Sequence, residues 1–456
     1  MRKLLIVLIG LFFQLQALAQ DTTRLSLLFV GDIMQHDSNI AAAYNSVTGK
    51  YDYSACFEYV SPIIQSADLA IGNLELTLAG KPYKGYPQFS APNELAYELK
   101  RAGFDVLVTA NNHSVDRGRK GIERTIDVLD TLTFLHTGTF KDSLTRSITY
   151  PLLVEKNGFR LSLLNYTYAT NGIPVPRPGM VNLIDTVQIK IDLKKAREQH
   201  SDAIMVFMHW GDEYQSLPNK SQKKLAELCF REGAKMVIGS HPHVLQPMEW
   251  RKEKDQIIAY SLGNFISGQR PRYRDGGAML WIDLQKVSKD SISLTSINNA
   301  QYELEWVQKS NDAKKEFVML PFRYFESDTT FMEDKLLKDA FGVFKKDSRA
   351  LYAKHNVNVP EKNTDVVSDS LRYSVCLGVF TEEQSKVVIE NPELKNYGIF
   401  KLPNGDFQFL LYAGKFSDRT SAEKVLIEIQ SRTSFKQIHV ARRISERSSI
   451  QPSSGN

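Results

Sequence analysis

Short apolar runs alternate with amphipathic stretches through the first two thirds of the chain. Residues 92–103 and 221–233 carry apolar side chains at helical spacing, and each stretch ends on a glycine, Gly103 or Gly233, as helices often do. A β-rich apolar run follows each of these stretches directly. Alternation of this kind predicts a layered α/β domain over residues 24–325.

Five of the apolar runs end on side chains that can bind a metal ion. In an open α/β sheet the carboxyl ends of parallel strands share one edge, so ligands far apart in sequence can converge there. Asp, Glu, Asn and His suit zinc, manganese or iron and leave a coordination position open for water. The sequence therefore predicts a metal centre at this edge, with six candidate ligands: Asp32, Glu75, Asn112, His209, His241 and His243.

The first twenty residues have the pattern of a secretory signal. A basic start precedes an apolar run over residues 4–15 and a small-residue site that ends at Ala19. The run is shorter than the ~20 residues of a membrane span, and no later stretch is long and apolar enough. We therefore expect a signal over residues 1–19, cleaved near Ala19. The mature protein should be exported, periplasmic or cell-envelope associated, without a transmembrane segment.

Composition changes this picture little. The chain is 42% hydrophobic and 24% charged, which is typical of a folded protein. Its formal net charge is +5 and no basic run is interleaved with aromatic residues, which excludes nucleic acid as the expected partner.

Cys56, Cys229 and Cys376 cannot all pair within one chain. We expect buried free thiols, although a bridge between Cys56 and Cys229 stays open.

The last part of the chain has a different pattern. Residues 326–370 are polar and charged, with a helix predicted over 332–355, and we interpret this segment as a connector. Strand patterns return over residues 371–444 around one further amphipathic helix, which predicts a small α+β domain. The Ser-rich tail over residues 445–456 is expected to be disordered.

Several motifs together give the first domain a specific resemblance. They are VGDIM, AIGNLE, TANNHSVDRG, HWGDEY, IGSHPHVLQPME and SLGNF. The stretch from residue 25 to 325 resembles capsule-synthesis proteins of the CapA type, which are associated with poly-γ-glutamate and related envelope polymers. These proteins are similar to the calcineurin-like metallophosphatase superfamily. The resemblance implies a four-layer α/β/β/α sandwich.

The resemblance also implies roles for the site residues. His113 would stand where the superfamily places a histidine that protonates the leaving group, and its ordinary pKa near ~6.5 suits proton transfer at neutral pH. The alternative is that His113 only orients a metal ligand. The ligands would divide into Asp32 and His243 at one metal, Asn112, His209 and His241 at a second, and Glu75 between the two.

Three positions depart from the superfamily pattern. Met34 stands where a ligand histidine is usual, Glu75 replaces a bridging aspartate, and Ser240 replaces a glycine. A thioether is a poor ligand for zinc or manganese, so the first metal lacks one ligand. His36 could compensate, or it could be a plain surface residue. The cofactor is thus expected to be one or two divalent ions of zinc, manganese or iron.

Arginines in two predicted loops are candidate anion ligands, because guanidinium groups match phosphate or carboxylate. Solvated loop charge is the alternative for all of them: Arg117, Arg119, Arg270, Arg272 and Arg274. We single out Arg117 and Arg272, together with Asn264 of the SLGNF motif, as substrate-binding candidates.

Residues 371–444 resemble a SPOR domain, a βαββαβ-type module that binds peptidoglycan glycan strands. The resemblance rests on RYSVCLGVF and FLLYAGKFSDRTSAEKVLIEI, although Cys376 occupies a position where a glutamine-like residue is usual. Tyr373, Phe409 and Tyr412 are the candidates for stacking on sugars. Aromatic residues that alternate along a strand are also common in cores, and this alternative stays open.

These features together predict an exported metal-dependent hydrolase that acts on a cell-envelope polymer or its phosphorylated precursor. The last domain would hold the protein at peptidoglycan. Two alternatives remain: a capsule assembly or polymer-binding factor without turnover, and a metal-dependent epimerase. In the epimerase, His113 or Asp116 would exchange a proton at carbon.

Overall fold

The computed structural model shows two compact units, which we describe separately. The first comprises residues 1–319 and 334–362, and the second comprises residues 320–333 and 363–456. The predicted signal and the predicted tail both lie outside the described residues. In the described part of the chain, no helix is both long and apolar enough to cross a bilayer. The described residues are 21–46, 48–289, 292–310, 316–326, 332, 334–362, 371–403, 408–416, 419–435 and 438–444.

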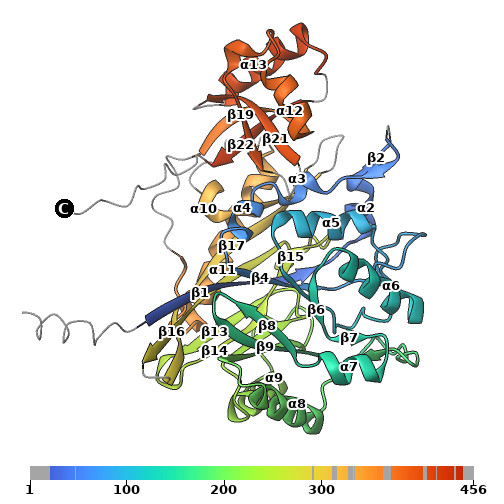
Figure 1. The fold of residues 1–456 in the computed structure, drawn as a ribbon, viewed down its shortest axis with the longest axis vertical. Helices are drawn as coiled ribbons and strands as arrows, with labels where there is room; N and C mark the ends of the chain where they lie inside the picture. Colours follow the sequence, from blue (N-terminus) through green and yellow to red (C-terminus); the bar gives the residue numbers. More distant parts are fainter. Residues whose placement is uncertain are drawn as a thin grey trace, which may run out of the picture. The chain divides into compact units, whose positions relative to one another are not determined.

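An eight-stranded sheet forms one half of the first unit (Figure 1). Its β1, β4, β5 and β6 are parallel, while β16 and β17 form a long antiparallel hairpin beside β1. A short strand, β15 (Asn264–Ile266), also pairs with the end of β1. The order is β18 (Phe317–Pro321), β17 (Ile292–Lys309), β16 (Gly276–Lys289), β1 (Asp21–Ile33), β4 (Leu69–Leu74), β5 (Val106–Val108) and β6 (Leu135–Thr137).

A six-stranded sheet forms the other half. Its four inner strands are parallel, and an antiparallel strand closes each edge. The two sheets pack together where β1 meets β12 and β14. The order is β13 (Leu245–Arg251), β14 (Gln256–Leu262), β12 (Met236–Ser240), β11 (Ala203–His209), β9 (Phe159–Thr167) and β8 (Leu152–Lys156).

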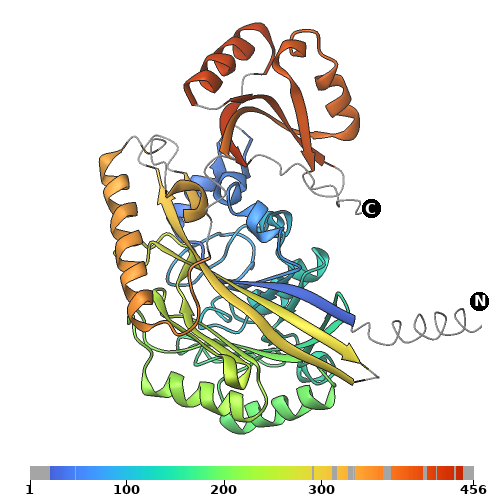
Figure 2. The ribbon, with the colours of Figure 1, turned by 90° about the vertical axis from the view of Figure 1, so that its left-hand side faces the viewer.

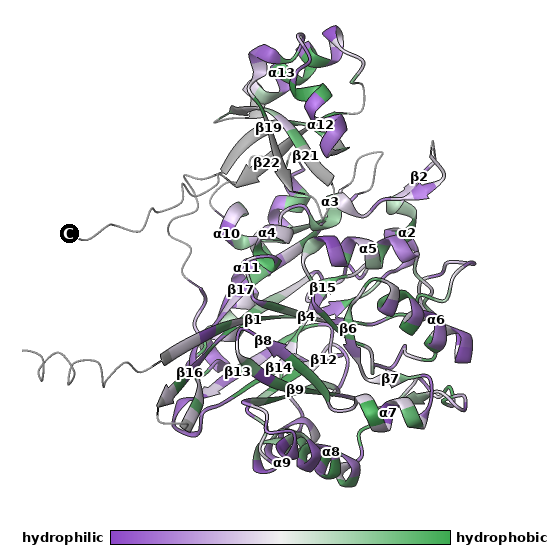
Figure 3. Ribbon diagram, viewed as in Figure 1, coloured by the Kyte–Doolittle hydropathy of each residue, from purple (hydrophilic) through white to green (hydrophobic). Residues whose placement is uncertain are grey.

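Helices cover the outer faces of both sheets and complete the predicted α/β/β/α layers (Figures 1 and 2). On the six-stranded sheet, α8 (Thr186–Glu198) and α9 (Lys220–Arg231) bury apolar side chains against the strands. Green and purple alternate along these two helices, as expected for one face on the sheet and one in water (Figure 3). On the other side lie α5 (Asn93–Ala102) and α6 (Gly118–Thr131).

The glycines predicted to end two helices do so. Gly103 follows α5 and Gly233 lies just beyond α9, with φ of 105° and 96° respectively. Glycine alone takes this left-handed backbone without a steric cost, which explains why the helices end there.

Cys56 and Cys229 are buried in the first unit as free thiols, which confirms the prediction for these two residues. Cys376 of the second unit is buried as well.

The remaining elements of the first unit are short. The short elements are α2 (Asp37–Ala43), β2 (Tyr44–Asn45), β3 (Lys50–Tyr51), α3 (Ser54–Phe57), α4 (Ser61–Ile64), β7 (Thr139–Phe140), α7 (Ser143–Thr149), β10 (Met180–Val181) and the 3₁₀ turn η2 (Lys252–Lys254).

The helix predicted in the connector exists, but it belongs to the first unit. It is α11 (Lys335–His355), which contacts β13 and β17 and buries Phe341, Phe344 and Tyr352. Beyond it, Val357 exchanges backbone hydrogen bonds with β13. The segment over Asp334–Lys362 is therefore part of the first unit rather than a connector, because its apolar face packs on that unit.

The second unit has the chain order βαββαβ, with two helices, α12 and α13, where the sequence pattern predicted one. Its antiparallel sheet has the order β20-β21-β19-β22 and encloses a core that includes Val375, Leu411 and Ile429. The SPOR assignment itself stays a prediction. The elements are α10 (Phe322–Phe325), β19 (Leu371–Thr381), α12 (Glu382–Ile389), the 3₁₀ turn η4 (Lys395–Tyr397), β20 (Ile399–Pro403), β21 (Gln408–Phe416), α13 (Arg419–Arg432) and β22 (His439–Ile444).

Candidate metal centre

All six predicted ligands meet in one buried place. Their side chains are at most 3% exposed, and each comes from the carboxyl end of a strand or from the turn after it. The prediction placed them on one sheet edge, whereas they come from two. Asp32, Glu75 and Asn112 follow strands of the eight-stranded sheet, while His209, His241 and His243 follow strands of the six-stranded sheet.

Two overlapping sets of donor atoms share one carboxylate. Glu75 groups with His241 and His243 in one set and with Asp32 and His209 in the other, and within each set the donor atoms lie within 4.8 Å of one another. Glu75 Oε1 is 3.5 Å from His209 Nε2 and 3.8 Å from His243 Nε2. Sharing of this kind is what a carboxylate between two metal positions requires.

The turn after β12 presents its two histidines through a strained backbone. His241 and His243 have φ of 96° and 58°, a region that residues other than glycine adopt at a cost of about 1–3 kcal/mol. The turn brings the ring centroids to 5.9 Å from each other, and His243 Nδ1 lies 3.0 Å from Asp32 Oδ2. Strain of this kind accumulates at functional sites, because the surrounding structure imposes it.

Atoms without partners show that the residues fit a cation. Glu75 Oε1 and His241 Nδ1 are enclosed, and neither has a hydrogen-bond partner in the described structure. An enclosed polar atom without a partner costs free energy that a bound divalent metal would offset. Carboxylate and imidazole donors together suit zinc, manganese or iron, so the donor set fits one of these ions.

Burial sets the protonation of the site. Burial and the neighbouring Asp32 raise the pKa of Glu75 well above its ordinary value. Burial lowers the pKa of His209, and burial with nearby His243 lowers the pKa of His241 to about 3. Both imidazoles are therefore neutral at physiological pH, which is the form that binds metals.

Two polar neighbours orient His209. Ser240 Oγ lies 3.0 Å from His209 Nδ1, so the serine at the usual glycine position supports a ligand ring. On the other side of the ring, His209 Nε2 is 2.7 Å from Asn112 Oδ1, close enough for both atoms to face one cation. Asn112 is itself held by a hydrogen bond from its Nδ2 to Asn171 Oδ1.

Asn73 is a central site residue that the sequence reasoning missed. Its Nδ2 donates to Asp32 Oδ1 at 2.9 Å and lies 3.4 Å from Glu75 Oε2 and 3.3 Å from His209 Nδ1. The signal was present, because residues two apart on a strand share a face and Asn73 precedes Glu75 by two.

His113 forms a buried pair with Asp116. His113 Nδ1 lies 2.7 Å from Asp116 Oδ2, which also accepts a hydrogen bond from the backbone N–H of Phe89 at 2.7 Å. The Phe89 ring meets the imidazole edge-on at 4.5 Å between centroids. This pair fixes the orientation of His113 and leaves Nε2 as the nitrogen available for proton transfer.

The residues at the incomplete first position lie nearby. Met34 is buried between β1 and α2. His36 is partly exposed, and its Nδ1 accepts a hydrogen bond from the backbone N–H of Gly268 at 3.1 Å. Burial, followed by the influence of His243 and His113, lowers the pKa of His36 to about 4, so its ring is neutral.

Aromatic side chains at the site were also missed. Tyr168 lies 4.5 Å from His241 and Tyr214 lies 6.2 Å from His243, between ring centroids. Both tyrosines are 44% exposed, so they form part of the rim of the site. Arg274 lies over the Tyr214 ring at 4.1 Å, which brings one guanidinium to this rim.

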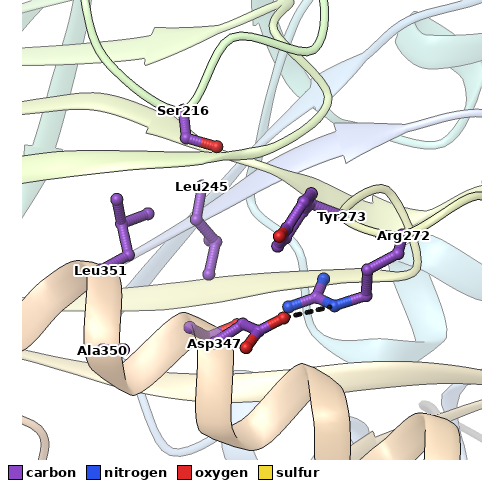
Figure 4. A pocket seen from close by; sticks show the side chains of 8 residues that line it. Ser216, Leu245, Arg272, Tyr273, Asp347, Ala350 and Leu351 are labelled. Carbon is purple, nitrogen blue, oxygen red and sulfur yellow. Dashed lines mark ion pairs between the residues drawn. The ribbon is translucent and has the colours of Figure 1, made fainter.

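Arg272 is engaged in ion pairs. Its Nη1 donates to Asp275 Oδ1 at 3.2 Å, and its Nε lies 3.4 Å from Asp347 Oδ2 (Figure 4). The Nε and Nη2 atoms are enclosed, so a ligand could reach them only after rearrangement. The residue lines a cavity of about 250 Å³ together with Ser216, Leu245, Tyr273, Asp347, Ser348, Ala350 and Leu351.

The other two substrate-binding candidates differ in position. Asn264 on β15 is the strand partner of Asp32 on β1. Its Nδ2 donates hydrogen bonds to Gln269 Oε1 and to the Arg274 carbonyl. Its enclosed Oδ1 has no hydrogen-bond partner among the described residues. Arg117 precedes α6 and is partly exposed, with its Nε enclosed.

The glycan-stacking candidates are only partly described. The side chains of Tyr373 and Phe409 lie outside the described residues. Tyr412 is 5% exposed, so its ring packs inside the second unit and leaves little surface for a sugar.

Comparisons with solved structures found several similar chains. The calcineurin-like phosphoesterase YfkN from Bacillus subtilis is 11% identical, with a TM-score of 0.39 over 72% of this chain and 98% of that chain. A hypothetical protein from Thermus thermophilus is 16% identical, with a TM-score of 0.33 over 59% of this chain and 97% of that chain.

Sequence comparisons show the family. Capsule biosynthesis protein CapA of Bacillus anthracis is 32% identical over 265 residues, which cover 55% of this chain and 61% of that protein. PGA biosynthesis protein CapA of Bacillus subtilis (strain 168) is 31% identical over 286 residues, 60% of this chain and 71% of that protein. The chain thus spans less than two thirds of the first relative. The family described as "Bacterial capsule synthesis protein PGA_cap" matches residues 26–269, and the chain belongs to this family.

Proposed function

We propose that the chain is an exported metal-dependent hydrolase of capsule synthesis that acts on a cell-envelope polymer or its phosphorylated precursor. The observation that carries the proposal is the pair of donor sets that share Glu75 beside the buried His113–Asp116 pair. Family membership supports an envelope polymer as the substrate class. Residues 371–444 would hold the protein at peptidoglycan glycan strands.

The chain's own residues suit phosphate ester hydrolysis. A divalent metal held by Asp32, Glu75, Asn112, His209, His241 and His243 would supply a water of lowered pKa and neutralise charge on substrate oxygens. Asp116 holds His113 by Nδ1, so Nε2 is the atom that would give a proton to the leaving group. The Phe89 ring packs edge-on against the His113 imidazole.

One observation favours each alternative. Met34 leaves the first metal position one ligand short, which favours a single tightly bound ion and supports a factor that binds polymer without turnover. The buried His113–Asp116 pair could also move a proton at carbon, as an epimerase requires. Metal content together with hydrolysis separates these alternatives from the main proposal.

The test compares purified protein with His241→Ala and His113→Ala variants, and with His355→Ala as a control on α11. We expect metal in the wild type, the control and His113→Ala, and hydrolysis of simple phosphomonoesters or diesters in the wild type and the control only. Metal without hydrolysis would support the binding factor or the epimerase. A metal-free wild type in the presence of zinc and manganese rejects the proposal.

Peptidoglycan attachment needs a separate test. The full-length protein should sediment with glycan strands stripped of stem peptides, and deletion of residues 371–456 should abolish sedimentation while metal content stays unchanged. Equal sedimentation of both proteins would reject this part of the proposal.

A further inference from the structure

His36 lies close to the metal centre. The sequence motif around Asp32 does not tell whether His36 binds a metal there. The Phe89 ring contacts both His36 and His113, with centroid distances of 5.4 Å and 4.5 Å. His36 follows Met34 by two residues, so it is the nearest imidazole in sequence to the position that lacks a ligand. Two roles are open to it: a replacement metal ligand, or a contact to the bound substrate.

The hydrogen bond from Gly268 decides which nitrogen carries the proton. A backbone N–H can only donate, so His36 Nδ1 must be the acceptor and cannot also carry a hydrogen. A ring with one free nitrogen is neutral, and its single hydrogen is then on Nε2. A protonated Nε2 has no lone pair for a metal ion. Coordination through Nε2 would move the hydrogen to Nδ1, where it would face the N–H of Gly268.

The fold is built around this hydrogen bond. A Cβ atom at Gly268 would lie 2.6 Å from His36 Cβ, so only glycine lets the donor come this close. A Cβ atom at Gly85 would lie 2.9 Å from His36 Cα. Asp37 Oδ1 accepts a hydrogen bond from the backbone N–H of Gly85 at 2.7 Å, which fixes this second contact. Gly268 and Gly85 therefore lie against Cβ and Cα of His36, and the hydrogen bond from Gly268 to Nδ1 orients the ring.

The hydrogen bond from Gly268 engages Nδ1 and leaves Nε2 as the nitrogen that could donate to a ligand. His36 is partly exposed. We propose that His36 Nε2–H donates a hydrogen bond to an oxygen of the anionic group bound at the metal centre, and that His36 does not replace the ligand missing at Met34. The ligand class is a phosphate or carboxylate. The contact to the anionic group rests on the proposed metal centre. The position of the His36 proton on Nε2 does not, because it follows from the hydrogen bond with Gly268.

The proton can be located directly by ¹⁵N NMR of histidine-labelled full-length protein, with His36→Asn used to assign the signal. We expect a protonated Nε2 and a bare Nδ1, with no change of protonation when zinc is added. Loss of the Nε2 proton on zinc addition would overturn the inference. If the wild type takes up no metal, the proposed function fails. The NMR result would still show which His36 nitrogen carries the proton.

The role can be tested with His36→Asn, which retains an oxygen acceptor for Gly268 and a favourable residue at the start of α2. We expect unchanged zinc content and unfolding midpoint, and an affinity for inorganic phosphate that falls about 10- to 100-fold, as for a hydrogen bond to a charged group. His355→Ala is the matched histidine control and should match the wild type. The inference is contradicted if His36→Asn loses zinc or keeps the phosphate affinity of the wild type. It is also contradicted if the zinc-loaded wild type binds no phosphate.

Discussion

Two fully buried glutamates, Glu75 and Glu305, lie in very different surroundings. Both are 0% exposed and both have carboxylate oxygens without hydrogen-bond partners among the described side chains. Burial raises the pKa of each well above its ordinary value, with Asp32 contributing at Glu75 and Asp275 at Glu305. Three histidines surround Glu75, whereas Arg270 is the charged group of opposite sign near Glu305.

Burial of an acid does not by itself make a metal site. Near Glu305, Arg270 donates to the carbonyls of Val307 and Ser267, and Trp306 Nε1 donates to Asp275 Oδ2 at 3.0 Å. No imidazole takes part in these contacts, so nothing there favours a metal. The neutral imidazoles of His209 and His241 supply lone pairs that a cation at Glu75 needs, and only that glutamate is expected to ionise on metal binding.

The same substitution at both glutamates should have the largest difference in effect. Glu75→Gln removes the carboxylate shared by both donor sets, so we expect metal binding and hydrolysis to be lost. Glu305→Gln should leave both within about twofold of the wild type. Elemental analysis and phosphoesterase assays measure the two properties, and equal behaviour of the variants would contradict the distinction.

A second substitution separates chemistry from metal binding at the Glu75 site. His113→Ala should retain metal, because its ring pairs with Asp116 rather than with the donor sets. Hydrolysis should fall by about 10²–10⁴-fold, the usual contribution of a general acid. A variant that keeps full activity would show that His113 only orients its neighbours.

The smallest effect that we expect is on the pH dependence of stability, through Glu305. Its pKa is raised from the ordinary 4.5, so above pH 4.5 the unfolded state loses a proton that the folded state keeps. The free energy of unfolding should therefore fall as pH rises above 4.5, by up to ~1.4 kcal/mol per pH unit, until the folded pKa is reached.

Glu305→Gln removes that slope, because a glutamine does not titrate. Urea unfolding of both proteins at about pH 5 and about pH 8 measures the difference, in which the contributions of all other groups cancel. A wild type that gains stability relative to Glu305→Gln between these pH values would mean that the folded carboxylate is ionised and paired.

Much of the site was predictable because strand ends are visible in the sequence. Apolar runs that end on Asp32, His209 and His241 gave the ligands, and glycines after helical patterns gave the ends of α5 and α9. Residue type and local spacing carry this information, so it needs no knowledge of distant contacts.

Most of the errors and omissions involve contacts between distant segments. The sequence does not tell that the ligands come from two sheets rather than one, or that α11 packs on the first unit. The enclosure of Arg272 by Asp275 and Asp347 depends on the position of that same helix. The signal for α12 was local but overlooked: Thr381 and Gln384 form a capping box at its start.

The most direct test of the metal centre is the metal content of the full-length protein after purification with zinc and manganese supplied. We predict one or two ions per chain in the wild type and in Glu305→Gln, and none in Glu75→Gln. A metal-free wild type, or the same metal content in all three proteins, would contradict the claim that the residues around Glu75 form a metal centre.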